Sequence, residues 1–383
     1  MDSTKRYKRL LERYMNGGLD RRTFFTLLGA AGVAAGIAGG PFRFITRDAL
    51  AAVTELRFDG WGGVVSEAVS KYGIQPFTAA TGIKVAEGTF GGTDEFFAKV
   101  KASQPGEYNI FHSSGVFDYS RWVNAGFGTV INEDNVPNLK LVMEALMTPF
   151  RKITPEGLSA APYDYGTTGL AWHRKHVTDD YAHEMGAKML VDPQWKGKMG
   201  SYSDWREQIW YAALGSDQHP NDVKDMDAVW DHMREHRKLV LKYWSSGAEL
   251  MSLFAEEEMY VSTAWSGRIA RLRQEGHDIG FFNPPNGYGW MEAMFVIKGS
   301  PMAECEQFLN FLLEPEAAIA VAIAQNYPPS LDPLKVPMPE AVQNIPTYDP
   351  TGKLAALTFA DPDYWNGHEG DWAKKANRVM KGF

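Results

Sequence analysis

The sequence predicts an α/β protein that folds as two lobes. Its 383 residues exceed what one compact core usually carries, so two lobes are the default. Hydrophobic residues make up 44% of the chain and charged residues 22%, as in an ordinary globular protein. Strand and helix patterns alternate along the chain, which is typical of parallel sheets with helical crossovers.

Residues 1–51 have the three-part layout of an export signal. A basic stretch and the pair Arg21-Arg22 precede an apolar run from Phe24 to Gly40, and the small-residue site Ala49-Leu50-Ala51 closes the segment. The paired arginines resemble the twin-arginine signal. The apolar run is short for a membrane span, which favours a cleaved signal over a retained anchor. We therefore expect export to the periplasm by the twin-arginine route.

The charge of the chain favours a cationic partner. Its net charge is −8, and it becomes −13 without residues 1–51, which hold nine Lys and Arg against four Asp and Glu. An acidic surface steers small cations toward a protein and repels duplex nucleic acid. We expect no nucleic-acid partner.

The first part of the folded chain is predicted to form a βαβαβ unit. Its elements are strand 54–59, helix 64–78, strand 82–85, a helix capped by Thr93 or Asp94, and strand 108–112. Parallel strands bind ligands in the loops at their carboxyl ends. The glycine-containing turns after Asp59 and His112 fall at those ends.

The middle of the chain is predicted to form the second lobe. A turn-forming crossing over 161–170 leads into it, and Asp204 opens a helix within it. A strand over 290–297 returns to the first lobe. These patterns divide the chain into the signal 1–51, the first lobe 52–164, the second lobe 165–289, and a return to the first lobe with the C-terminal helices and tail over 290–383.

Several motifs occur in the order found in a known family. They lie at 77–85, 162–169, 204–207, 265–267, 290–292 and 308–316. Their order and spacing resemble the polyamine-binding branch of the periplasmic solute-binding proteins, the spermidine/putrescine-binding type. The resemblance covers nearly the whole chain after the signal. It implies a two-lobed type II periplasmic binding protein fold, in which each lobe is a mostly parallel sheet flanked by helices and the ligand lies in the cleft between the lobes.

The resemblance also implies a function without catalysis. Such a protein captures a polyamine such as putrescine or spermidine by hinged closure. It then delivers the amine to a membrane permease that works with an ATPase, as part of an ABC transporter. We expect the binding protein to be a monomer that needs no cofactor.

The family binds ammonium groups with carboxylates and alkyl chains with aromatic faces. The matched positions here hold the carboxylates Asp204, Glu207 and Glu292, the tryptophans Trp61, Trp265 and Trp290, and the hydroxyl of Ser114. A charge-assisted hydrogen bond contributes about 1.5–3 kcal/mol, and a Trp face contributes roughly 0.5–2 kcal/mol to a cation. Two or three such groups would account for micromolar binding, about 8 kcal/mol.

Some positions depart from the family pattern. Gly62, Gly63 and Val64 stand where polar or aromatic groups are often found, and Val116 stands where a Tyr is often found. Arg268 follows the motif 265–267 and could reach the cleft. A cleft arginine would favour a ligand with a carboxylate. A zwitterionic amine, such as γ-aminobutyrate or a betaine, is therefore the alternative ligand class.

Each predicted site residue also has a purely structural interpretation. Asp204 could cap its helix, with Glu207 completing a capping box. Trp265 and Trp290 could be core residues, because large aromatic side chains dominate cores. Arg268 could be a solvated or salt-bridged surface residue.

A different class of function, a zinc-dependent hydrolase, is suggested by His232 and His236. They form an H-x-x-E-H pattern that can bind zinc. Charged neighbours on the same helix indicate a solvated face, and no third ligand accompanies the pair. A nucleophile elbow and a phosphate-binding loop are also absent from the sequence. We therefore predict no catalytic residue and no metal site.

Overall fold

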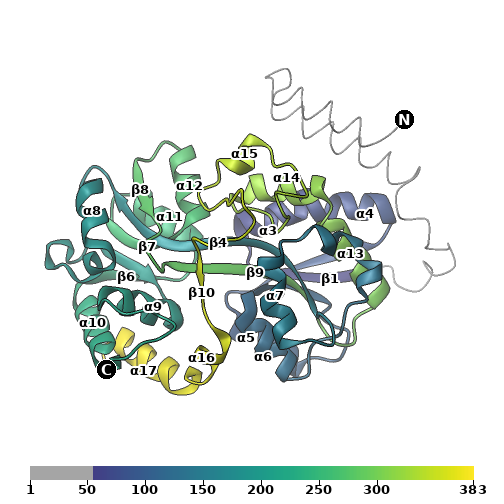
Figure 1. Ribbon diagram of the computed structural model, residues 1–383, viewed down its shortest axis with the longest axis horizontal. Helices are drawn as coiled ribbons and strands as arrows, with labels where there is room; N and C mark the ends of the chain where they lie inside the picture. The colour runs from purple at the N-terminus through teal and green to yellow at the C-terminus, as the bar shows by residue number, and fades with distance from the viewer. Residues whose placement is uncertain (1–54) are drawn as a thin grey trace. The chain divides into compact units, whose positions relative to one another are not determined.

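The computed structural model describes residues 55–383, so the predicted export signal lies outside the described residues. The described chain forms two compact units (Figure 1). Unit 1 contains the described residues up to Asp164 together with Met291–Lys353. Unit 2 contains Tyr165–Trp290 and Leu354–Phe383. Each unit is an α/β structure, so the predicted fold class is confirmed.

The sheet of unit 1 has three parallel strands and one antiparallel strand. The strands are β1 (Glu55–Gly60), β2 (Lys84–Thr89), β3 (Ile110–Ser114) and β9 (Tyr288–Val296), in the order β2-β1-β3-β9. Strand β1 is parallel to β2 and β3 and forms the predicted βαβαβ unit with them. Strand β9 is antiparallel to β3 and places Glu292 opposite Ser114.

Helices cover both faces of the unit 1 sheet (Figure 1). One face carries α3 (Gly63–Val69), α4 (Gln75–Thr81), α13 (Met302–Leu312) and α14 (Pro315–Gln325); the other carries α5 (Thr93–Ala102), α6 (Gly115–Asn124) and α7 (Glu144–Ile153). Aromatic side chains fill the space beneath them. The rings of Phe111 and Trp122 lie 4.3 Å apart, and Phe77 packs on Phe308 at 5.0 Å. Helix α5 begins at Thr93 after Gly92 without a side-chain cap, so the predicted cap by Thr93 or Asp94 is wrong.

The sheet of unit 2 is also mixed. Its strands are β4 (Ala160–His173), β5 (Met199–Tyr202), β6 (Val240–Trp244), β7 (Val261–Trp265) and β8 (Ile279–Phe282), in the order β8-β4-β7-β5-β6. Strand β5 is parallel to β6 and β7, while β4 is antiparallel to β7 and β8. Strand β4 is one continuous buried strand, although its sequence suggested a turn at 161–170.

Helices cover the sheet of unit 2 as well (Figure 1). They are α8 (Asp179–Met185), α9 (Trp205–Gly215), α10 (Met226–Leu239), α11 (Gly247–Ala255) and α12 (Ser266–Gln274). The C-terminal helices α16 (Pro362–Asn366) and α17 (Glu369–Lys381) belong to this unit, and α17 contacts α9 and α10.

The tail from Leu354 groups with unit 2, whereas the sequence led us to expect it in the first lobe. The reason is aromatic packing, since Trp365 stacks on Trp210 of α9 at 5.8 Å. Within residues 55–383 no single helix is long and apolar enough to cross a membrane. Helices α13 and α14 pass that test only as a pair, bent by 67°.

Candidate functional site

The predicted site residues of unit 1 include a pair on neighbouring strands. Ser114 ends β3 and is the register partner of Glu292 on β9. The backbone N–H of Ser114 donates to Asp118, which fixes the start of α6. Gly115 follows with a φ of 61°, and a Cβ there would lie 2.9 Å from the carbonyl oxygen of Met291. A glycine is therefore required where β3 and β9 approach each other.

Glu292 belongs to a buried cluster that the sequence analysis missed. Nε2 of His112 lies 2.9 Å from Oε2 of Glu292 and 3.9 Å from Oδ2 of Asp164. The His112 and Asp164 side chains are each 1% exposed, and that of Glu292 is 14% exposed. Gln325 donates to Oδ2 of Asp164 over 2.6 Å. His112 and Asp164 are therefore shielded from solvent, whereas Glu292 is partly accessible to it.

The charges of this cluster depend on one another. Burial raises the pKa of Asp164 to about 8, with the charge of Glu292 as the next cause. Burial alone would lower the pKa of His112, but the charges of Glu292 and Asp164 outweigh it, so that pKa is raised. His112 and Glu292 are close enough to form an ion pair, but their atoms are not aligned for a hydrogen bond. Both raised pKa values favour the protonated forms of His112 and Asp164.

Trp61 lies just after the carboxyl end of β1, as the sequence predicted. Its ring packs edge-on against Phe90 at 4.8 Å, and it is half-buried. The indole N–H is buried and has no hydrogen-bond partner within the described residues. Gly62 and Gly63 beside it adopt positive φ angles of 77° and 53°. This loop places an aromatic face two strands away from β9 in the sheet order of unit 1.

In unit 2, Asp204 caps α9. Its Oδ1 accepts the backbone N–H groups of Arg206 at 2.9 Å and Glu207 at 3.3 Å. Arg206 lies 3.7 Å from Oδ2 of Asp204 and donates to Glu369. The carboxylate that the resemblance assigned to a ligand therefore has a structural role in this conformation.

Glu207 does not complete a capping box with Asp204. It is 2% exposed, and its Oε2 accepts a 3.0 Å hydrogen bond from Thr168 of β4. Oε1 is buried without a hydrogen-bond partner in the described chain. Burial raises the pKa of Glu207 to about 8, helped by the charge of Asp204. A buried carboxyl whose pKa is perturbed in this way marks a candidate functional group.

The other predicted residues of unit 2 gather around the same stretch of β4. Trp265 ends β7 opposite Thr168, and its ring packs against Tyr202 and Trp244, each at 4.9 Å. A Cβ on Gly166 would lie 2.4 Å from the ring of Trp290. Glycine at 166 therefore makes room for the half-buried indole of Trp290.

Arg268 is buried in the first turns of α12, with 8% of its surface exposed. Its side chain passes beside Gly247, where an added Cβ would lie 2.4 Å from Nε. The interpretation of Arg268 as a solvated surface residue is therefore wrong. A guanidinium in the core of unit 2 is a group that can pair with a buried anion.

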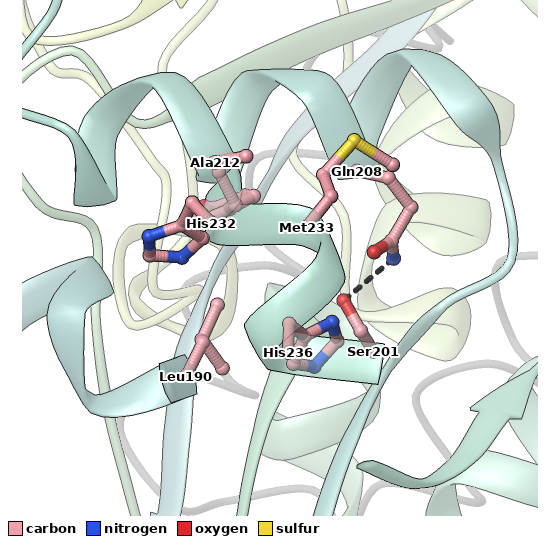
Figure 2. A pocket seen from close by; sticks show the side chains of 8 residues that line it. Leu190, Ser201, Gln208, Ala212, His232, Met233 and His236 are labelled. Carbon is pink, nitrogen blue, oxygen red and sulfur yellow. Dashed lines mark hydrogen bonds between the residues drawn. The ribbon is translucent and has the colours of Figure 1, made fainter. Parts of the chain in front are cut away.

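His232 and His236 line a small pocket between α9 and α10 (Figure 2). The lining residues are Leu190, Ser201, Gln208, Tyr211, Ala212, His232, Met233 and His236. Burial lowers the pKa of His232 to about 4 and that of His236 to about 3. The two histidines point inward, although the charged neighbours on α10 had suggested a solvated face. Within residues 55–383 the only group of three or more candidate metal ligands is His112, Asp164 and Glu292, so no third ligand of this kind joins the pair.

The structure brings together two groups of predicted residues. Ser114 and Glu292 are register partners in unit 1. In unit 2, Glu207, Trp265 and Trp290 each contact β4, at Thr168 or Gly166. The residues missed by sequence reasoning, His112 and Asp164, stand 52 positions apart. Asp164 lies within the motif 162–169 and His112 ends the predicted strand 108–112, but neither was recognised as a site residue.

Comparison with known proteins gives three results. Residues 74–349 match the family described as bacterial extracellular solute-binding protein. A spermidine/putrescine-binding periplasmic protein of Escherichia coli is 25% identical over 284 residues, which are 72% of this chain and 78% of that protein. A gamma-aminobutyric acid-binding protein of Pseudomonas aeruginosa is 26% identical over 160 residues, 41% of this chain and 44% of that protein.

The fold has solved counterparts. The binding protein AgtB from A. tumefaciens R10, in complex with agropinic acid, is similar with a TM-score of 0.69. The alignment covers 86% of this chain and 99% of that chain at 20% identity. The likeness confirms the predicted two-lobed binding-protein architecture.

Proposed function

Because the chain belongs to the family of bacterial extracellular solute-binding proteins, we propose that it captures a small cationic amine of the polyamine class and delivers it to an ABC permease. The family consists of solute-binding proteins, which are not enzymes. The zinc-hydrolase alternative is therefore excluded, and binding is the activity that the site must explain.

The observation that carries the polyamine proposal is the buried carboxyl of Glu207. The pKa of Glu207 is set by burial, by the charge of Asp204 and by the hydroxyl groups of Thr168 and Thr263. None of these contributes a positive charge. A carboxyl that loses water without gaining a cation is stabilised as a carboxylate when a ligand supplies the positive charge. Glu292 offers a second, partly exposed carboxylate in unit 1. Two such groups suit an amine with two charged ends.

Aromatic faces support the same ligand class. Trp265 and Trp290 accompany Glu207 in unit 2, and Trp61 lies in unit 1. An alkylammonium chain gains both apolar contact and cation–π attraction from such rings. Capture would proceed by hinged closure. The relative from E. coli bears a name that states spermidine and putrescine binding.

A zwitterionic amine is the second candidate, and the burial of Arg268 favours it. A buried guanidinium could hold the carboxylate of a ligand such as γ-aminobutyrate. The relative from P. aeruginosa is named for that compound. Arg268→Lys separates the two candidates, because it would weaken the binding of γ-aminobutyrate and leave putrescine binding unchanged.

The test is thermal unfolding of the protein with putrescine, spermidine, γ-aminobutyrate, betaine and zinc. A ligand that binds only the folded state raises the midpoint by mass action. A shift with the diamine or triamine supports the polyamine class, and a shift only with γ-aminobutyrate or betaine selects the zwitterionic class. No shift with any amine contradicts the proposal.

Export and assembly complete the proposal. We propose that the twin-arginine signal directs the chain to the periplasm, where it acts as a monomer with its permease and ATPase. Replacing Arg21 and Arg22 by lysine should leave the protein in the cytoplasmic fraction. Periplasmic recovery of that variant would rule out this export route.

A further inference from the structure

We propose that Thr168 is a positioning residue of the amine site, and that its hydroxyl holds Glu207 so that the carboxyl oxygen Oε1 accepts an N–H of the ligand. The site then selects ammonium groups that carry N–H over ammonium groups that are fully methylated. This inference rests on the proposed function and deepens it, because it narrows the class of cation that Glu207 takes. All the residues that carry it belong to unit 2.

Thr168 shares one face of the unit 2 sheet with two residues of β7. The antiparallel pairing of β4 and β7 places Thr168 opposite Trp265 and Leu170 opposite Thr263. Side chains two apart on a strand, and register partners on antiparallel strands, point to the same face. Thr168 and Thr263 therefore lie on the same face as Trp265. The hydrogen bond from Thr168 brings Glu207 of α9 to this face.

The two carboxyl oxygens of Glu207 have different surroundings. Oε2 accepts the 3.0 Å hydrogen bond from the hydroxyl of Thr168. Oε1 is buried and has no hydrogen-bond partner within the described residues. The hydroxyl of Thr168 has a single hydrogen, which is committed to Oε2. Oε1 is therefore the oxygen that can take a donor from a ligand, and a buried acceptor without a partner is costly.

The hydroxyl of Thr168 also decides which of two roles Glu207 has. Glu207 is the third residue of α9 after the cap Asp204, a position from which a glutamate can turn back to the backbone N–H of the cap residue. The carboxyl instead points to β4 and bonds Thr168. Without this hydroxyl the carboxyl loses its donor on β4, and the start of the helix becomes its alternative. The hydroxyl thus assigns Glu207 to the sheet face beside Trp265.

The chemistry of Oε1 defines the cation that fits. The oxygen of an ionised carboxyl only accepts hydrogen bonds, so its partner must bring an N–H or O–H. The ammonium groups of putrescine, spermidine and γ-aminobutyrate carry N–H, whereas the trimethylammonium group of betaine carries none. The ring of Trp265 attracts both kinds of cation, so aromatic contact does not separate them. The carboxyl does, because a methylated cation leaves Oε1 buried without a donor.

The experiment compares each amine with its fully methylated counterpart by isothermal titration calorimetry at about pH 7, where both are positively charged. The pairs are putrescine with its hexamethyl derivative, and γ-aminobutyrate with its N-trimethyl derivative. We expect the wild type to bind the N–H form of a pair about tenfold or more tightly than the methylated form. This ratio of affinities is the preference that the variants should change.

Three variants at position 168 test the positioning. Thr168→Val keeps the branched shape of the side chain and removes the donor, so the preference for the N–H form should fall toward equality. Thr168→Ser restores the hydroxyl and should restore the preference. Thr168→Cys offers a weaker donor and should give an intermediate preference, which keeps the test open if the valine variant does not fold.

Two further comparisons separate positioning from packing. In Glu207→Gln the amide oxygen can still accept from Thr168, but an NH2 group takes the place of Oε1. Adding Thr168→Val to this variant should therefore cause no further loss of affinity. Thr167→Val is the matched control, because Thr167 is buried on the opposite face of β4 and its hydroxyl has no hydrogen-bond partner in the described chain. Its preference should equal that of the wild type.

Each outcome decides between the two proposals. Failure of both putrescine and γ-aminobutyrate to bind the wild type overturns the proposed function and the role of Thr168 together. Amine binding with equal affinity for both members of a pair, or a preference that Thr168→Val leaves unchanged, overturns the role of Thr168 and leaves the proposed function standing. A loss from Thr168→Val that is equally large in the Glu207→Gln background, or a loss of preference in Thr167→Val, assigns Thr168 to packing and also overturns that role.

Discussion

Oγ1 of Thr168 donates a 3.0 Å hydrogen bond to Oε2 of Glu207, which ties the first turn of α9 to the middle of β4. Glutamine at 207 can keep this hydrogen bond and the shape of the side chain, but it removes the charge that a cation would contact. We expect Glu207→Gln to weaken putrescine binding about tenfold or more, the loss of one charge-assisted contact. Calorimetric titration measures the change.

The matched control for this substitution is Glu235→Gln. Glu235 lies on the exposed side of α10, where it pairs with Lys238. A surface pair of this kind contributes little, so the control should bind like the wild type. Equal affinity of the Glu207→Gln variant and the wild type would remove Glu207 from the binding site.

The same carboxyl should make the ligand-free protein less stable as the pH rises. Glu207 has a pKa of about 8 when folded and an ordinary value of 4.5. Between these values the folded chain holds a proton that the unfolded chain has lost, so stability falls with increasing pH. The slope from one group is at most about 1.4 kcal/mol per pH unit.

Glu207→Gln should remove this contribution. Its advantage in free energy of unfolding over the wild type should therefore grow from about pH 5 to about pH 8, measured by urea unfolding. Other buried acids, such as Asp164, are common to both proteins and cancel in the difference. A constant difference across this range would show that Glu207 is ionised in the folded protein.

The sequence predicted several strands well and missed the longest one. The strands expected at 54–59 and 290–297 correspond to β1 (Glu55–Gly60) and β9 (Tyr288–Val296), within one or two residues at each end. The stretch 161–170 looked like a turn because it contains Pro162, Gly166 and Gly169. The structure requires both glycines for another reason, since Cβ atoms there would lie 2.4 Å from the ring of Trp290 and 2.5 Å from that of Phe281. Close packing from distant segments cannot be seen in the local sequence.

The candidate site was predictable only where a motif carried it. The helix cap by Asp204 follows from residue type and position, and the structure has it. The capping box did not form, and Glu207 instead accepts a hydrogen bond from Thr168. The contacts of His112 and Asp164 with Glu292 could not be predicted from the sequence, because only tertiary folding brings these residues together. Arg268 had two interpretations, a cleft residue and a surface residue, and its burial in α12 contradicts only the second.

The contact between Gly166 and Trp290 offers a second test of the candidate site. Alanine at 166 would place a Cβ 2.4 Å from the indole, so the ring must move. We expect Gly166→Ala and Trp290→Ala each to weaken amine binding about tenfold, because both displace an aromatic face from the ligand. Fluorescence or calorimetric titration measures this loss.

Gly370→Ala is the control for the added methyl group. Gly370 lies exposed in α17 with open space around its Cα, so alanine fits there. Its affinity should equal that of the wild type. Wild-type affinity in both Gly166→Ala and Trp290→Ala would mean that Trp290 is a core residue rather than a ligand wall.

The histidine pocket should behave as part of the core of unit 2 rather than as a metal site. His232 packs against Gly215 of α9 so closely that an alanine Cβ would lie 2.0 Å from Cε1 of the imidazole. We expect Gly215→Ala to lower the free energy of unfolding by about 1–3 kcal/mol through overpacking, and to leave putrescine affinity unchanged. Zinc should not raise the thermal midpoint of the wild type, because the two imidazoles have no third ligand among the described residues. A zinc-dependent rise that His236→Asn abolishes would contradict this prediction and assign metal binding to α10.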